Sequence, residues 1–185
     1  MHHPLENIPL EWRSKVFWLL LALTLALMVV FNLTGASLAT PAAPLGIVSY
    51  ELAGSPLQAQ AMLDSWDQKA KLAAAFGLGL DYLFMAAYST TVGLGCIWAG
   101  DALLRQRWPL SGLGVWLAWG LWLAAALDAI ENLALTVIML GTVASPWPEI
   151  ARWCALVKFG LLFVGLVYAF LGLVVNLSGR LLRDR

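Results

Sequence analysis

Charged residues are scarce in this sequence. Only 12% of the 185 residues are Asp, Glu, Lys or Arg, and 61% are hydrophobic, whereas an average soluble domain is about 25% charged and about 45–50% apolar. The polar residues are too few to cover a water-facing globule, so the composition predicts an integral membrane protein whose partners are membrane lipids. Eleven basic residues balance eleven acidic ones, which leaves no basic stripe for nucleic acid.

Histidine and cysteine are nearly absent. His2 and His3 are the only histidines, and they lie at the N-terminus, where we expect a mobile chain, so metal binding by histidine is excluded. Cys96 and Cys154 lie far apart inside apolar stretches, which excludes a paired-cysteine redox motif and a disulfide framework. We therefore predict no metal site and no cofactor.

Proline is missing from four long apolar stretches, residues 16–38, 72–100, 111–143 and 153–177. Each is long enough to cross a hydrocarbon layer, which takes roughly 20 helical residues. All eight prolines lie outside them, as expected for helices that satisfy their own backbone hydrogen bonds in lipid. The sequence predicts an all-α fold, a single transmembrane domain over residues 1–185 that forms an up-down-up-down four-helix bundle.

Lysine and arginine are distributed unevenly over the flanks of these stretches. Three lie in the first and second outer loops, Lys69, Lys71 and Arg152. Seven lie in the termini and the middle turn, namely Arg13, Lys15, Arg105, Arg107, Arg180, Arg183 and Arg185. Because positive residues accumulate on the inner side, we predict a multi-pass protein of the cell membrane with both termini in the cytoplasm.

The first stretch has a second interpretation, a cleaved signal peptide. Ser37, Leu38 and Ala39 offer small residues for cleavage. The apolar core of this stretch exceeds the usual 7–15 residues, however, and cleavage would leave three spans. These two points favour a retained helix.

The first outer loop, residues 39–71, contains the signature of a helix start. Ser55 is followed by Pro56, Leu57 and Gln58, the pattern of an N-cap, a proline at the first helical position and a capping-box glutamine. We predict a short amphipathic helix that lies at the membrane interface and leads into the second span. A solvated helix that only covers the end of the bundle stays open as the alternative.

Four ionisable residues lie well inside the predicted spans: Asp81, Asp128, Glu131 and Lys158. A charge near the centre of a transmembrane helix costs about 2.5–3.5 kcal/mol, so four of them cost on the order of 10 kcal/mol. That sum is comparable to the net stability of a whole domain. These side chains must therefore pair, take up protons or meet water.

Depth and helical phase bring these residues together with three polar neighbours. By the rise of an α-helix, the four ionisable residues, Asn132 and Asn32 lie in the outer half of the membrane, and Tyr88 shares the helix stripe of Asp81. Lys158 of the fourth span shares its helix stripe with small residues, which close helix packing in lipid prefers. The candidates for binding a ligand or an ion are Asp81, Asp128, Glu131, Asn132, Lys158, Tyr88 and Asn32.

The polar cluster has more than one functional interpretation. Three acids against one base leave two carboxylates without a cationic partner, which favours a site that binds or carries a small molecule, an ion or a proton. Interhelical glue in a structural or assembly subunit of a larger membrane complex, or in an oligomer, is one alternative. The other is an intramembrane enzyme that acts on a lipid or a quinone-like substrate, although no histidine is available within the spans to serve as its base.

Overall fold

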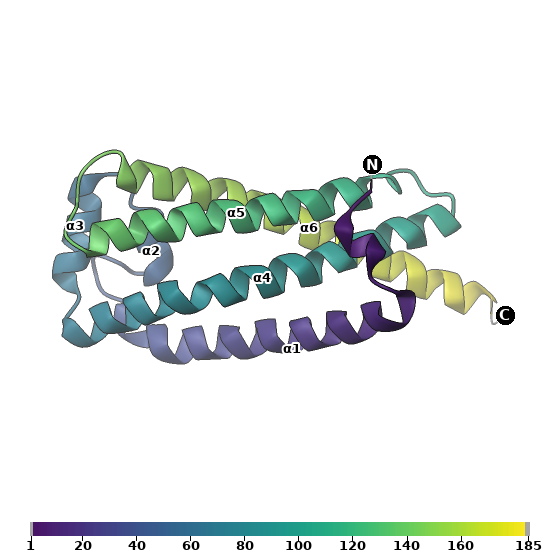
Figure 1. The fold of residues 1–185 in the computed structure, drawn as a ribbon, viewed down its shortest axis with the longest axis horizontal. Helices are drawn as coiled ribbons and strands as arrows, with labels where there is room; N and C mark the ends of the chain where they lie inside the picture. Colours follow the sequence, from purple (N-terminus) through teal and green to yellow (C-terminus); the bar gives the residue numbers. More distant parts are fainter. Residues whose placement is uncertain (1, 184–185) are drawn as a thin grey trace. The chain divides into compact units, whose positions relative to one another are not determined.

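The computed structural model describes residues 2–183, and the chain forms helices without any strand in that range. Four short helices are η1 (Pro4–Asn7), η2 (Ala36–Leu38), α2 (Ile47–Glu51) and α3 (Pro56–Ser65). Four long helices are α1 (Leu10–Gly35), α4 (Gln68–Arg105), α5 (Leu113–Met139) and α6 (Trp147–Arg183) (Figure 1). The long helices are long and apolar enough to cross a membrane. They confirm the prediction of an all-α four-helix membrane protein.

The helix boundaries differ from the predicted ones where side chains and glycines cap the ends. The second span begins earlier than residue 72, because Asp67 accepts a hydrogen bond from the Ala70 N–H at 2.7 Å and caps the start of α4. The third span ends before residue 143, because Gly141 adopts a φ of +105°. There the Thr142 N–H reaches back to the Val137 carbonyl at 3.2 Å, as in a Schellman motif.

The chain is organised as two compact units. The loop unit comprises Leu23–Met85 and Ala126–Lys158, and the terminal unit comprises Met1–Ala22, Ala86–Ala125 and Phe159–Arg185. Each long helix contributes one segment to each unit. The loop unit also contains η2, α2 and α3.

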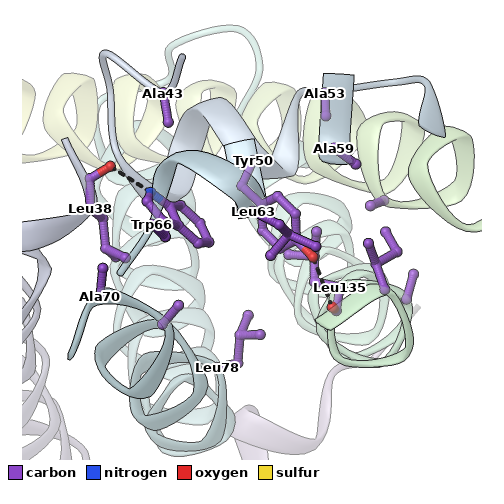
Figure 2. Close-up of a cluster of buried hydrophobic side chains, with 14 residues drawn as sticks. Leu38, Ala43, Tyr50, Ala53, Ala59, Leu63, Trp66, Ala70, Leu78 and Leu135 are labelled. Carbon is purple, nitrogen blue, oxygen red and sulfur yellow. Dashed lines mark hydrogen bonds between the residues drawn. The ribbon is translucent and has the colours of Figure 1, made fainter. Parts of the chain in front are cut away.

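The loop unit encloses a hydrophobic core in which two aromatic side chains hold the loop against the long helices. The Trp66 indole N–H donates to the Leu38 carbonyl at 2.9 Å, and the Tyr50 hydroxyl donates to the Leu135 carbonyl at 3.2 Å (Figure 2). These contacts bury the polar ends of large apolar side chains without leaving them unpaired. The residues of the core come from η2, the loop that follows it and helices α2 to α6.

Helix α3 begins as the sequence predicts. Ser55 is its N-cap, and its hydroxyl oxygen accepts a hydrogen bond from the Gln58 N–H at 3.3 Å. Ala59 and Leu63 are buried in the core, whereas Leu57 is exposed. The inner face of α3 therefore covers the core of the loop unit.

The terminal unit depends on small residues and on a buried histidine. His3 is fully buried, and its ring lies edge-on to Trp119 and Trp122, with centroids 4.7 and 4.6 Å apart. Its Nδ1 accepts the Leu5 N–H at 3.1 Å. The expectation of a mobile N-terminus is therefore wrong at His3, because η1 folds this residue against α5.

Gly172 of α6 is a close-packing position, and its replacement provides a test. A Cβ at Gly172 would overlap the Cα and Cβ of Ala99 on α4, whereas a Cβ at Gly160 on the same helix meets nothing within 4 Å. We expect Gly172→Ala to lower the free energy of unfolding by about 1–3 kcal/mol, as overpacking does. Gly160→Ala should leave it unchanged or raise it slightly. Thermal unfolding of both variants in one detergent measures the difference, and equal melting temperatures would contradict the contact.

Candidate functional site

The buried polar residues of the loop unit project from three long helices. Asp128, Glu131 and Asn132 lie at positions i, i+3 and i+4 of α5, which places them on one face of that helix. Lys158 comes from α6 and Asp81 from α4. The three α5 residues and Lys158 are at most 7% exposed. We call these five residues, together with Glu51 described below, the polar cluster.

A doubly bridged lysine lies at the centre of the polar cluster. The Lys158 ammonium donates to Asp128 Oδ1 at 2.6 Å and to Glu131 Oε1 at 2.9 Å. Charge-assisted hydrogen bonds of this length are the strong ones, and they are needed to offset the removal of three charges from water. Of the three predicted intramembrane acids, Asp128 and Glu131 therefore contact the lysine directly and join α5 to α6.

Asp81 joins the polar cluster through an amide. The Asn132 side-chain N–H₂ group donates to Asp81 Oδ2 at 2.7 Å. Asp81 also lies close enough to Asp128 for the two carboxyl groups to interact. Its side chain is only half-buried, so Asp81 lies at the accessible edge of the cluster.

Glu51 is a member of the polar cluster that the sequence analysis missed. It is the last residue of α2, its Oε2 lies 3.9 Å from the Lys158 Nζ, and its side chain is 12% exposed. The missed signal is local: Glu51 follows Tyr50 in a loop segment with few other polar residues. Because Tyr50 is anchored to Leu135, the neighbouring carboxylate is directed toward the lysine.

The polar cluster contains more hydrogen-bond acceptors than donors. Four carboxylates, those of Glu51, Asp81, Asp128 and Glu131, surround the single ammonium of Lys158. The Oε2 atoms of Glu51 and Glu131 are buried and accept no hydrogen bond from the described part of the chain. Buried acceptors of this kind are costly unless something else satisfies them. The arrangement is therefore suited to taking up a proton or a small cationic group.

The other two predicted site residues are Asn32 and Tyr88. Asn32 is on α1 of the loop unit with an exposed side chain, and no contact of the polar cluster with it is found among residues 2–183. Tyr88 is buried and belongs to the terminal unit. The structure therefore brings together Asp81, Asp128, Glu131, Asn132 and Lys158, and it adds Glu51.

The chain was compared with protein families, curated proteins and solved structures. No protein-family model matches the chain, and neither the curated proteins nor the solved structures contain a significant match. Within residues 2–183, no group of three or more histidine, cysteine, aspartate or glutamate side chains is arranged to hold a metal ion.

The protonation of Glu51 is linked to folding. The pKa of Glu51 is raised from 4.5 to about 7, chiefly by burial. Lys158 opposes this rise, and the nearby Asp128 and Asp81 add to it. Glu131 also faces this site, because it accepts a hydrogen bond from the same Lys158 ammonium. Since the folded chain holds the Glu51 proton at a pH where the unfolded chain has lost it, this group's contribution to stability falls as pH rises from about 4.5 to about 7.

We expect Glu51→Gln to remove this part of the pH dependence. In the unmodified protein, the free energy of unfolding should decrease by about 3 kcal/mol across that range from this group alone. The measurement is denaturant unfolding in detergent at about pH 5 and about pH 8. Asp64→Asn, which removes an exposed carboxylate that accepts from Gln60, serves as the control. Equal pH dependence in Glu51→Gln and in the unmodified protein would refute the assignment.

Proposed function

We propose that this multi-pass membrane protein is a proton-linked carrier whose polar cluster binds and releases the proton. The supporting observation is the imbalance between four carboxylates and one ammonium in a buried site. Ionisable residues inside a membrane commonly mark ion pathways and proton relays.

Charge counting supports a bound proton. If all four carboxylates were ionised, Lys158 would neutralise one of them and three negative charges would remain. Each uncompensated charge at this depth costs about 2.5–3.5 kcal/mol even on the mildest scale. A proton is the ligand that needs the least rearrangement, because the lysine contacts of 2.6 and 2.9 Å leave the centre of the cluster filled.

Access to the polar cluster is provided by its edge residues. Asp81 is half-buried, and Glu51 is carried by the loop helix α2 rather than by a span. A proton that reaches either carboxylate is already beside the Lys158 ion pairs. Asp81, the half-buried member, is the carboxylate at which we expect a proton to enter the cluster.

Interhelical glue is the competing interpretation, because the same ion pairs join α5 to α6. The two interpretations differ in whether the charged residues serve the stability of the fold or transport. Glue requires the charge pair for stability and predicts no transport. A carrier site contains charge that function needs and that stability alone would discard.

We expect Asp128→Asn and Glu131→Gln to abolish proton flux and to change stability by about 1 kcal/mol or less, because the amides preserve hydrogen bonding. Lys158→Met should cost about 3–5 kcal/mol, since it strands two buried acids. Proton flux is measured in liposomes with an entrapped pH-sensitive dye and an imposed membrane potential, and stability by thermal unfolding in detergent. Asp64→Asn is the matched control outside the cluster.

The decisive comparison is between folding and flux. Loss of flux in Asp128→Asn with an unchanged melting temperature supports the carrier. If the variants unfold early but conduct as the unmodified protein does once folded, or if the unmodified protein moves no protons, the cluster is glue and the carrier proposal fails.

We also infer that both termini are cytoplasmic, from the excess of Lys and Arg on that side. The C-terminal contribution to the excess includes Arg185, which lies outside the described residues. Single cysteines at Lys69 and Glu149 should react with an impermeant maleimide added to intact cells, whereas a cysteine at Arg105 should react only after permeabilisation. The opposite pattern would reverse the orientation.

A further inference from the structure

The terminal unit contains a second feature, unrelated to the polar cluster: an apolar groove between α1, α4 and α6. Its cavity volume is about 580 Å³, within the range of about 300–1,000 Å³ typical of small-molecule sites. The walls are large side chains from all three helices, including Phe17, Trp18, Trp98, Phe170 and Leu173. We call this cavity the groove.

Small residues create the depth of the groove. Gly95 and Ala99 of α4 and Gly172 of α6 line it, and Gly172 packs directly on Ala99. Where two helices approach this closely, the larger side chains on either side stand out as walls. The groove is therefore formed by the packing of α4 against α6, with α1 as its third wall.

One end of the groove is polar and cationic. Arg105, the last residue of α4, and Asn176 of α6 both line it. They lie at the same level, because the neighbouring Gln106 side chain donates to the carbonyl of Val175. Neither Arg105 nor Asn176 makes a side-chain hydrogen bond or ion pair within residues 2–183, whereas the other polar lining residue, Thr91, donates to the Ala87 carbonyl at 2.8 Å.

We propose that the groove binds one anionic phospholipid, with an acyl chain between the three helices and the phosphate at Arg105 and Asn176. An apolar cavity along membrane-spanning helices fills with hydrocarbon, since water there would find few polar partners. Guanidinium groups bind phosphate oxygens in a bidentate manner, and the amide supplies a further donor. Basic pockets between transmembrane helices recognise anionic headgroups in this way.

The arrangement of groove and charge favours a lipid over a free anion. An isolated phosphate would contact only the end of the groove and leave its apolar length empty. A zwitterionic lipid could fill the groove, but its headgroup carries a cation that would lie beside Arg105. The anionic phospholipid satisfies both the apolar length and the cationic end.

The test measures lipid retention by native mass spectrometry. Detergent-purified protein is mixed with phosphatidylglycerol or with phosphatidylcholine of the same chains, and the bound fraction is compared. We expect about tenfold preference for phosphatidylglycerol, because the choline cation of phosphatidylcholine would lie beside the Arg105 guanidinium and be repelled by it. Arg105→Gln should remove the preference, whereas Arg107→Gln, an exposed arginine that does not line the groove, should retain it.

Two further measurements distinguish binding of the whole lipid from binding of its phosphate or headgroup alone. Inorganic phosphate and glycerophosphoglycerol, the headgroup without chains, should not raise the melting temperature of the protein in detergent, whereas phosphatidylglycerol should. Equal retention of the two lipids by the unmodified protein would overturn the proposal. So would an equal loss of preference in Arg105→Gln and Arg107→Gln, or stabilisation by phosphate alone.

Discussion

The loop unit is organised around the Lys158 ammonium and its two carboxylate partners. A buried ammonium is tolerated only where short hydrogen bonds replace the water it has lost, and Asp128 and Glu131 supply them at 2.6 and 2.9 Å. Because these acids lie one turn apart on α5, the lysine determines which face of that helix meets α6. The same face carries Asn132, and through its amide the constraint extends to Asp81 on α4.

Apolar packing determines where the remaining carboxylate lies. Tyr50 is bonded to the Leu135 carbonyl on α5, and this contact holds α2 in the core of the loop unit. Gly46 and Gly54, on either side of α2, adopt φ values of +59° and +68°, a backbone conformation that favours glycine. The chain can therefore turn sharply into α2 and out of it, and Glu51 is brought to the lysine by a five-residue helix rather than by a span.

The spans and much of the polar cluster were predictable because hydropathy, depth and helical phase are properties of each helix alone. Asp128, Glu131, Asn132 and Lys158 follow from these properties and meet as expected. Asn32 has the same depth but is exposed, since depth does not determine how a helix is rotated about its axis. Glu51 was not predictable, because its position depends on tertiary contacts of Tyr50 and on two loop glycines.

Helix α1 differs from the other three spans in its burial and in the residues it contributes. Only 6% of the most apolar 18-residue segment of α1 is buried, against 22–28% of the corresponding segments in the other three spans. It contributes no residue to the polar cluster, whose members come from α2, α4, α5 and α6. In the terminal unit, however, Phe17 and Trp18 of α1 wall the lipid-sized groove. A helix that buries so little surface is free of the constraints that the ion pairs impose on α5 and α6, and its side chains are left to meet hydrocarbon. Helices α4 and α6 contribute to both features, but with different segments that belong to different units. The polar cluster and the groove share no residue, so each can be altered by substitution without removing residues that form the other.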